Sequence, residues 1–347
     1  MVSTRLPFLI CIFFIILPLL LPCAAWADNI SVPPIFGVAL DGYPITGERL
    51  EQIQEQMGLC PGVVLFFLQW PPLPNQGEGH FPKESLNAIW NTGAIPCLTW
   101  EPMYYRDGQE LMIPYQAVLT GDYDPYIDEF AGRAALWEKP FMIRFAHEMN
   151  IKRYHWGTTG QQYGPESTAI YRKMFRYVVK KFREAGAKNV RWVFCPNAES
   201  VPNTTYDPSA SWNRIERYYP GDPYVDILGV DGYNWGNSRT KERDGWDSQW
   251  NDFTTIFAEA FTRLKGIAPE KPLFIFETAS VRQGGDRELW IKRAFEAIRD
   301  WHIDGLIWFQ VHKVQDWRLT AEEDAADIDR IRIHTSFPQQ WIKEMIP

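Results

Sequence analysis

The stretch Phe-Met-Ile-Arg-Phe-Ala-His-Glu at residues 141–148 is a short, mostly apolar run that ends in a carboxyl group. A second run of this kind, Leu-Phe-Ile-Phe-Glu, occupies residues 273–277. Continuous apolar runs of this length are typical of parallel strands that are buried on both faces. Burying a carboxylate costs several kcal/mol unless a partner compensates its charge. The two terminal glutamates, Glu148 and Glu277, are therefore candidate functional residues.

Apolar runs of this kind recur along the chain and alternate with amphipathic segments. The eight apolar runs are residues 35–40, 63–69, 94–100, 141–148, 190–196, 225–230, 273–277 and 305–310. The helix-like segments are residues 47–57, 83–91, 126–137, 166–184, 250–264 and 287–300, with weaker signals at 211–219 and after 324. This alternation predicts a parallel sheet covered by helices, and eight repeats predict an α/β protein with a closed (β/α)8 TIM barrel. An open nucleotide-binding sheet would favour a glycine-rich first turn, and none follows an early strand.

The N-terminal segment has the features of a secretory signal peptide. Arg5 precedes an apolar stretch over residues 7–21, and Ala-Trp-Ala at 25–27 has the small-x-small form of a cleavage site. We expect residues 1–27 to be the signal peptide and residues 28–347 to form one catalytic domain. The protein should then be secreted or periplasmic.

Composition narrows the class of partner. The net charge of -8 argues against a polyanionic partner such as nucleic acid. No later apolar stretch is long enough to span a bilayer, so we expect a mature chain without a membrane span that acts as a monomer. The chain has 16 Trp residues and an aromatic fraction of 15%, which fits either a large aromatic core or a groove that stacks sugar rings.

The cysteines indicate neither a disulfide scaffold nor a zinc site. Cys23 would leave with the signal peptide, and its context is poor for the alternative of lipid attachment. Cys60, Cys97 and Cys195 would remain, which permits one disulfide at most. Cys97 and Cys195 lie inside strand-like runs, where cysteine usually behaves as a small buried apolar residue.

Strand alternation suggests how the first glutamate is presented. Arg144, Ala146 and Glu148 should share one face of a strand, with His147 on the other. A buried guanidinium at Arg144 needs a carboxylate partner, which is either Glu277 or some other acid. Two carboxyl groups at the mouth of a barrel are the equipment of a glycosidase, and retaining enzymes place them about 5–5.5 Å apart. The alternative is a pair of salt-bridged glutamates with only a structural role.

Four motifs together resemble glycoside hydrolase family 26. Residues 144–150, Arg-Phe-Ala-His-Glu-Met-Asn, resemble its acid/base motif, and residues 226–234 resemble its sixth-strand motif. Residues 274–277 resemble its nucleophile strand, and residues 305–309 its eighth strand. The resemblance covers nearly all of the expected mature chain in the right order. It implies a retaining (β/α)8 enzyme that needs no cofactor or metal and acts within β-mannan, mixed-linkage β-glucan or β-1,3-xylan.

The resemblance also implies roles for individual residues. Glu148 would be the acid/base, Glu277 the nucleophile, and His147 would help to hold the sugar. Tyr233 would orient Glu277 through its hydroxyl. Trp308 would form the stacking floor under the reacting sugar, and Trp156 would line the leaving-group side. For each aromatic residue the alternative is ordinary core packing.

One position departs from the family pattern. Mannanases of the family usually carry a sugar-contacting histidine after the third strand, where this chain has Thr-Trp-Glu-Pro at 99–102. Glu101 would accept hydrogen bonds where an imidazole could donate them. This variant looks more like the glucanases of the family, so Glu101 is a candidate specificity residue. The segment 151–156 also differs from the commonest mannanase sequence, which bears on the role of Trp156.

Other chemistries find less support in the sequence. His147-Glu148 does not begin a zinc-protease motif because Ile151 stands where the second histidine is required. Asp324, Asp327 and Asp329 resemble a fragment of a calcium loop, but the turn glycine and the closing glutamate are missing, and a solvated helix start is the expected structure. We therefore predict a secreted retaining endo-β-glycanase that acts on a polysaccharide or oligosaccharide. The alternative from another class is a non-catalytic glycan-binding barrel, which would need neither glutamate.

Overall fold

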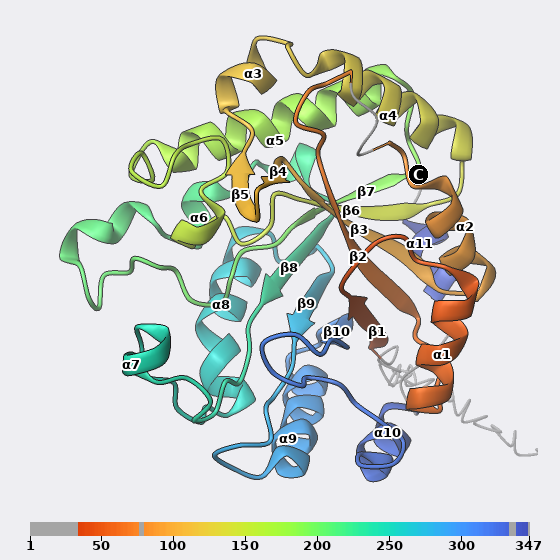
Figure 1. Ribbon diagram of the computed structural model, residues 1–347, viewed down its shortest axis with the longest axis vertical. Coiled ribbons are helices and arrows are strands. Elements are labelled where there is room, and N and C mark those ends of the chain that lie inside the picture. Colours follow the sequence, from red (N-terminus) through yellow and green to blue (C-terminus); the bar gives the residue numbers. More distant parts are fainter. Residues whose placement is uncertain (1–33, 76–79, 333–337, 346–347) are drawn as a thin grey trace, which may run out of the picture. The chain divides into compact units, whose positions relative to one another are not determined.

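The computed structural model describes residues 34–75, 80–332 and 338–345. Eight parallel strands form a closed barrel in the order β1-β10-β9-β8-β7-β6-β3-β2, which confirms the predicted (β/α)8 architecture (Figure 1). The barrel strands are β1 (Ile35–Leu40), β2 (Val63–Gln69), β3 (Ile95–Glu101), β6 (Phe141–Phe145), β7 (Val190–Phe194), β8 (Ile227–Asp231), β9 (Leu273–Thr278) and β10 (Gly305–Phe309). The expected signal peptide, residues 1–27, lies outside the described residues.

The helices follow the strands much as the periodicity predicts. The six predicted helices are α1 (Gly47–Met57), α2 (Lys83–Asn91), α4 (Asp124–Trp137), α5 (Ser167–Glu184), α8 (Phe253–Ile267) and α9 (Arg287–Asp300). The two weaker signals correspond to α6 (Ile215–Tyr218), α10 (Ala325–Arg332) and α11 (Pro338–Glu344). None of the helices in the described part of the chain combines the length and the apolar character needed to cross a membrane.

Several short elements in the loops were not predicted. They are a hairpin of β4 (Met103–Arg106) and β5 (Gln109–Met112), the helices α3 (Tyr115–Leu119) and α7 (Lys241–Asp244), and the 3-10 turns η1 (Lys152–Tyr154), η2 (Pro208–Trp212) and η3 (Asp222–Tyr224). The hairpin follows β3, and an ion pair of 2.8 Å between Glu110 and Arg153 joins it to the loop after β6. These elements lie in the loops between the barrel strands and their helices, so they shape the surroundings of the barrel without altering it.

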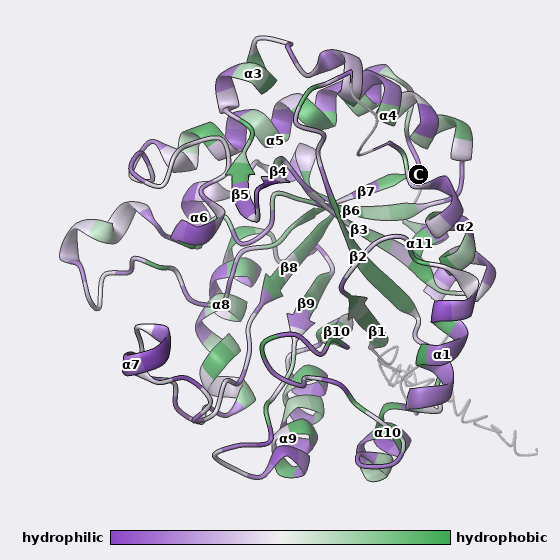
Figure 2. Ribbon diagram, viewed as in Figure 1, coloured by the Kyte–Doolittle hydropathy of each residue, from purple (hydrophilic) through white to green (hydrophobic). Residues whose placement is uncertain are grey.

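Two apolar layers hold the barrel together, one inside the strands and one between strands and helices. The inner layer comprises Ile35, Ala39, Val63, Leu65, Ile95, Cys97, Met142, Val193, Cys195, Ile227, Phe274, Phe276, Ile307 and Ile342. The outer layer is larger and aromatic, and the strands are the most uniformly hydrophobic part of the ribbon (Figure 2). Much of the tryptophan content is therefore core, since Trp70, Trp100, Trp290 and Trp308 are fully buried.

Candidate active site

Arg144 on β6 is the centre of a buried polar cluster inside the barrel. Its side chain is 0% exposed, and its Nη1 lies 2.5 Å from Asp231 Oδ2. Its Nη2 forms a second ion pair with Glu277 Oε1, and its Nε donates to Thr99 Oγ1 at 2.9 Å. Burial lowers the pKa of Arg144, but the charges of Asp231 and Glu277 outweigh it and hold that pKa well above its usual range. The partner of Arg144, left open by the sequence, is thus both Glu277 and Asp231.

An irregularity in β9 brings Glu277 to this cluster. Val230 of β8 pairs with Ile275, but the next residue, Asp231, pairs with Glu277, so β9 has one extra residue at Phe276. Regular alternation would turn Glu277 to the same side as Ile275, which packs in the outer layer. A β-bulge re-aims side chains in this way. Phe276 and Glu277 therefore both reach the interior side of the barrel.

Tyr233 completes the environment of Glu277. Its hydroxyl donates a hydrogen bond to Glu277 Oε2, while the guanidinium of Arg144 contacts Oε1. Burial, reinforced by the charge of Glu277, raises the pKa of Tyr233 well above its usual value, so the phenol stays protonated and keeps donating. Both contacts stabilise a negative charge on the Glu277 carboxylate. This contact is the one that the family resemblance implies for Tyr233.

Glu148 is positioned at the mouth by a left-handed backbone and not by a bulge. The predicted strand 141–148 ends at Phe145, because Ala146 and Glu148 both adopt a left-handed backbone with φ of 49°. Ala146 then packs in the outer layer, so the prediction that Arg144, Ala146 and Glu148 share one face is wrong. The Glu148 amide is held by the carbonyl of Cys195 at 2.8 Å. Backbone strain of this kind persists where surrounding contacts hold it, commonly at functional sites.

The Glu148 carboxyl group lies in surroundings unlike those of Glu277. Asn197 Nδ2 donates to Glu148 Oε1 at 2.6 Å, and Asn150 Oδ1 fixes Asn197 by accepting from its amide at 2.8 Å. Burial first, and then the nearby charge of Glu277, raise the pKa of Glu148 to about 7. Glu148 therefore holds its proton at neutral pH far more readily than an exposed glutamate would.

His147 and Trp156 lie together beside Glu148. Trp156 Nε1 donates to the His147 carbonyl at 2.6 Å, and the Trp156 ring stacks on Tyr154 with centroids 5.1 Å apart. Burial and the charge of Arg144 lower the pKa of His147 well below its usual value, so the imidazole is neutral. Its buried Nδ1 has no hydrogen-bond partner among the described residues, which suits a group that contacts substrate.

Glu101 lies at the end of β3, next to His147. Its Oε2 accepts a hydrogen bond from Gln69 Nε2, and its Oε1 is 4.0 Å from His147 Nδ1. Because the imidazole is neutral, this approach is not an ion pair. Burial raises the pKa of Glu101 to about 7. The structure therefore places a further buried carboxyl group beside His147, at the position where the sequence departs from the family pattern.

Trp308 is the predicted site residue that the structure does not bring to the mouth. It is 1% exposed, its ring packs at 6.3 Å from Trp290 of α9, and its Nε1 donates to the Trp317 carbonyl at 2.7 Å. Alternation along β10 explains this position: Ile307 belongs to the inner layer, so Trp308 faces the helices. The expectation of a stacking floor at Trp308 is therefore corrected to core packing.

Several residues of the cluster have no assigned role in the sequence prediction. They are Gln69, Thr99, Tyr154, Asn197, Asp231, Phe309 and Trp317. The signal for Asp231 and Asn197 was available, because each is a polar residue directly after an apolar strand. The rings of Phe309 and Trp317 lie 5.6 and 5.3 Å from that of Tyr233, and nothing in the local sequence predicts those contacts.

The described residues offer one trio of metal-ligand type within the cluster. Ligand atoms of His147, Asp231 and Glu277 lie within 4.8 Å of one another. The carboxylates already accept from Arg144, and Glu277 accepts from Tyr233 as well. A guanidinium in direct contact with both acids opposes a cation there, so we assign no metal to the trio.

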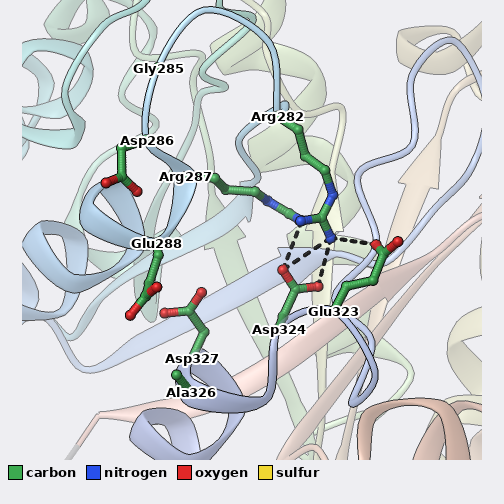
Figure 3. Close-up of a pocket in the computed structure, with 9 residues that line it drawn as sticks. All are labelled: Arg282, Gly285, Asp286, Arg287, Glu288, Glu323, Asp324, Ala326 and Asp327. Atoms are coloured by element: carbon green, nitrogen blue, oxygen red, sulfur yellow. Dashed lines mark hydrogen bonds and ion pairs between the residues drawn. The ribbon is translucent and has the colours of Figure 1, made fainter.

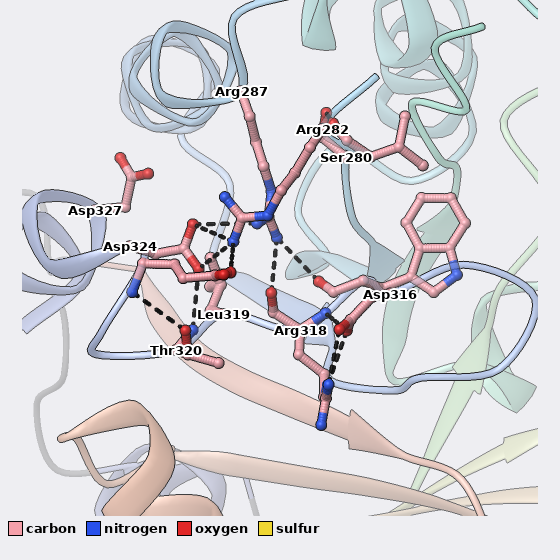
Figure 4. A network of polar contacts seen from close by, with 12 residues as sticks. Ser280, Arg282, Arg287, Asp316, Arg318, Leu319, Thr320, Asp324 and Asp327 are labelled. Carbon is pink, nitrogen blue, oxygen red and sulfur yellow. Dashed lines mark hydrogen bonds and ion pairs between the residues drawn. The ribbon is translucent and has the colours of Figure 1, made fainter. Parts of the chain in front are cut away.

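A second polar network lies between the loops that follow β9 and β10. Arg282 and Arg287 both donate to Asp324, and Arg282 also pairs with Glu323 (Figure 3). Arg287 further donates to the carbonyls of Trp317 and Arg318 at 3.1 and 2.9 Å (Figure 4). Asp324 therefore pairs with arginines. The expected helix start is confirmed, because α10 begins directly after Asp324, but Asp324 is buried and not solvated as expected.

This network borders a pocket of about 380 Å³. Its lining consists of Arg282, Gly285, Asp286, Arg287, Glu288, Glu323, Asp324, Ala326 and Asp327. None of the predicted site residues lines it. The network holds the Trp317 backbone through Arg287, and the Trp317 ring contacts Tyr233, so it supports one side of the carboxylate cluster from outside.

Comparisons with known proteins find a matching protein family and similar folds. The family model described as glycosyl hydrolase family 26 matches residues 124–280, which include Glu148, Asp231 and Glu277. The chain is 31% identical over 278 residues to Endoglucanase H of Acetivibrio thermocellus, a match over 80% of this chain and 28% of that protein. It is 32% identical over 94 residues to a mannan endo-1,4-beta-mannosidase of Bacillus subtilis, over 26% of this chain and 23% of that protein. The chain thus spans about a quarter of the length of these two relatives.

Solved structures share the fold at low identity. A family 26 β-mannanase from Bacteroides ovatus superposes with a TM-score of 0.59 at 18% identity, over 88% of this chain and 90% of that one. A ruminal family 26 endo-β-1,4-mannanase gives a TM-score of 0.60 at 17% identity, over 92% of this chain and 66% of that one. At this identity the likeness supports the barrel architecture alone.

Proposed function

Because the chain belongs to glycosyl hydrolase family 26, we propose that it is a secreted, monomeric, retaining endo-β-glycanase that cleaves within a β-linked mannan or mixed-linkage glucan. The observation that carries this proposal is the contrast between the two carboxyl groups at the barrel mouth. Glu277 contacts a guanidinium and a phenol that favour its charged form. Glu148 is buried and its pKa is raised to about 7, which favours its protonated form. Two carboxyl groups with opposite preferences supply a nucleophile and an acid.

The reaction proceeds by double displacement. In the first step Glu277 attacks the anomeric carbon and forms a glycosyl ester, while the glycosidic bond breaks and its oxygen takes the proton of Glu148. In the second step Glu148, now ionised, accepts a proton from water as that water attacks the same carbon and releases Glu277. The proton returned to Glu148 restores the starting state. Arg144 and Tyr233 stabilise the negative charge of the Glu277 carboxylate as it leaves the anomeric carbon.

The remaining residues of the cluster surround the reacting sugar. The buried Nδ1 of His147 has no hydrogen-bond partner among the described residues, and His147 is proposed to hold a sugar hydroxyl next to the cleaved bond. Trp156 is 3% exposed and stacked on Tyr154, so its role is to fix the backbone of His147 through its indole nitrogen while it bounds the leaving-group side. Arg144 is completely buried, so it acts through Glu277 and does not contact the sugar.

Glu101 is the residue proposed to select the sugar. Its carboxyl group is positioned by Gln69 beside His147, so it is available to a hydroxyl of the neighbouring glycosyl unit. A carboxylate accepts hydrogen bonds and orders hydroxyl groups differently from the histidine of the mannanases. One match, over 80% of this chain, is to an endoglucanase, but that name describes a protein of which the chain spans only 28%. Glucan and mannan therefore both stand as candidate substrates.

The test is the release of reducing sugar from mannan, lichenan, laminarin and β-1,3-xylan by the purified protein. We expect cleavage of lichenan or mannan with internal chain scission, and its loss in Glu277→Ala. Azide should restore cleavage by that variant with inverted configuration, because it can attack from the vacated side. If the wild type binds one of these glycans and cleaves none, the non-catalytic glycan-binding barrel is the correct function.

A further inference from the structure

A continuous series of aromatic rings leads away from the nucleophile to the protein surface. It starts at Tyr233, whose hydroxyl contacts Glu277, and passes to Trp235 with ring centroids 6.0 Å apart. Trp246 follows at another 6.0 Å, edge-on to Trp235. The ring of Trp317 contacts those of both Tyr233 and Trp235, with centroids 5.3 and 4.9 Å apart. Trp246 thus lies at most two ring-to-ring steps from the residue that holds the nucleophile.

The outermost ring of the series is unusually exposed. Trp246 is 46% exposed, whereas Trp317 is 2% exposed. The guanidinium of Arg239 lies 4.5 Å from the Trp235 ring centroid, so one face of Trp235 is covered. Trp246 is therefore the ring of this series with the most surface open to a ligand. The series of rings that begins at the nucleophile therefore ends in an exposed indole that a ligand can reach.

The segment that carries Trp246 is held in place by its own polar contacts. The backbone amide of Arg239 donates to Ser248 Oγ at 2.9 Å, and the backbone amide of Ser248 donates to the Arg239 carbonyl at 3.2 Å. Asp244 accepts from Arg239 Nη1 at 2.6 Å and from the Thr240 amide at 3.0 Å. These bonds close the segment 239–248 on itself around α7. The backbone that carries the exposed indole is thus held in place, which lowers the entropy lost on binding.

We infer that Trp246 is a distal stacking platform for a glycosyl unit of the β-glycan. Two ring-to-ring steps, through Trp235, separate it from Tyr233 beside the nucleophile. The inference rests on the proposed function for the identity of the ligand, since a pyranose ring presents the flat apolar face that an indole accepts. A short run of glycosyl units spans the two ring-to-ring steps. Trp246 therefore contributes to the binding of long substrates and not to the chemistry at Glu277.

The test compares wild type with Trp246→Ala on oligosaccharides of increasing length, from a reactive aryl disaccharide to a hexasaccharide and the polymer. We expect kcat/KM of the variant to fall by about ten-fold on the longest substrates, and the loss to shrink as the chain shortens. KM should carry the loss, because a contact made equally in ground and transition states does not change kcat. Trp246→Tyr should recover most of the affinity.

A matched control is Tyr206→Ala. Tyr206 is 81% exposed and has no ring contact among those found in the described residues, so its removal should leave every substrate unaffected. An equal loss of kcat/KM on all lengths in Trp246→Ala, or no loss on any, would overturn the inference. The first result would mean that the change disturbs Tyr233 instead.

A binding measurement separates this inference from the proposed reaction. Electrophoresis through gels that contain soluble β-glucan or galactomannan should retard wild type more than Trp246→Ala. If wild type is retarded but hydrolyses nothing, the proposed catalysis fails while the platform stands. If wild type hydrolyses a polymer and Trp246→Ala is retarded equally, the platform is wrong while the catalysis stands.

Discussion

Glu148 and Glu277 are the same amino acid at the mouth of one barrel, and their neighbours give them different chemistry. Glu277 accepts from Arg144 and Tyr233, which are both donors. Glu148 accepts from the neutral amide of Asn197 and experiences the negative charge of Glu277. The pair therefore resembles other enzyme carboxyl pairs whose environments divide the roles of acid and nucleophile.

Replacement of Tyr233 by phenylalanine tests the orientation of the nucleophile. The change keeps the ring packing against Trp317 and removes the hydroxyl that donates to Glu277. A hydrogen bond to a charged group contributes about 1.5–3 kcal/mol, so kcat/KM should fall by about 10- to 150-fold. Tyr105→Phe, which removes an exposed hydroxyl bonded to Glu110, is the control and should not change it. An unchanged kcat/KM in Tyr233→Phe would show that the Tyr233 hydroxyl does not orient the nucleophile.

The pH profile tests the assignment of the acid. Because burial raises the pKa of Glu148 to about 7, the protonated form is lost as pH rises through that value, and kcat/KM should decline on the alkaline side near pH 7. In its residual hydrolysis of the polymer, Glu148→Gln should lack this alkaline decline, because the amide has no proton to lose in this range.

Glu101 provides the control for that profile, because burial raises its pKa to about 7 as well. Glu101→Gln should alter substrate preference and retain the alkaline decline. If the decline disappears in Glu101→Gln and persists in Glu148→Gln, the acid has been assigned to the wrong glutamate.

The roles of residues at strand ends were predictable where the neighbouring sequence alone indicated burial or charge. Both glutamates follow apolar runs, and Arg144 required an acidic partner wherever it was buried. Trp308 was misassigned because a strand sequence does not show which of two buried faces a residue occupies. Asp231 received no role because one acidic partner was expected for Arg144, whereas Arg144 pairs with both Asp231 and Glu277.

At the scale of elements, the bulge in β9 is the feature on which the nucleophile depends. Gly229 on β8 faces the bulge, and a Cβ there would lie 2.5 Å from the Phe276 ring and 3.0 Å from Cys195 Sγ. Gly229→Ala should therefore displace Phe276, lower the free energy of unfolding by about 1–3 kcal/mol and reduce activity with it. Urea denaturation and kcat/KM measure the two effects.

Gly132 in α4 is the matched glycine. A Cβ there meets nothing within 4 Å, so Gly132→Ala should leave activity unchanged and stabilise the protein by about 0.4–1 kcal/mol. If Gly229→Ala is as harmless as Gly132→Ala, the close packing behind Glu277 is not what holds the bulge.

The regular elements were largely predictable, and the irregular ones were not. Strand 63–69 and the helices 47–57, 83–91 and 287–300 have the predicted bounds, because each is delimited by a clear change of period. Helix α1, for example, begins after Thr46, whose hydroxyl accepts from the Arg49 amide at 3.2 Å. The early end of β6 and the bulge in β9 depend on contacts with neighbouring strands, which periodicity does not encode.

At the scale of the whole molecule, a buried ion pair joins the last two barrel loops. Arg287 is 6% exposed and Asp324 is 5% exposed. Asp324→Ala would leave the buried guanidinium without its charged partner, which costs about 3–5 kcal/mol. Thermal unfolding should show a large loss of stability. Asp300→Ala, which breaks an exposed pair with Arg299, should change stability by no more than about 1 kcal/mol. Similar effects of the two changes would show that the network is not a structural link.

The central claim is that Glu277 is the nucleophile of a retaining glycosidase, and covalent trapping tests it most directly. A 2-deoxy-2-fluoro glycoside with a good leaving group should form the glycosyl ester and release it slowly. Peptide mass spectrometry of the inactivated protein is then expected to show one added glycosyl group, on Glu277. A label on Glu148 or Glu101, or hydrolysis with inverted configuration and no label, would contradict the claim.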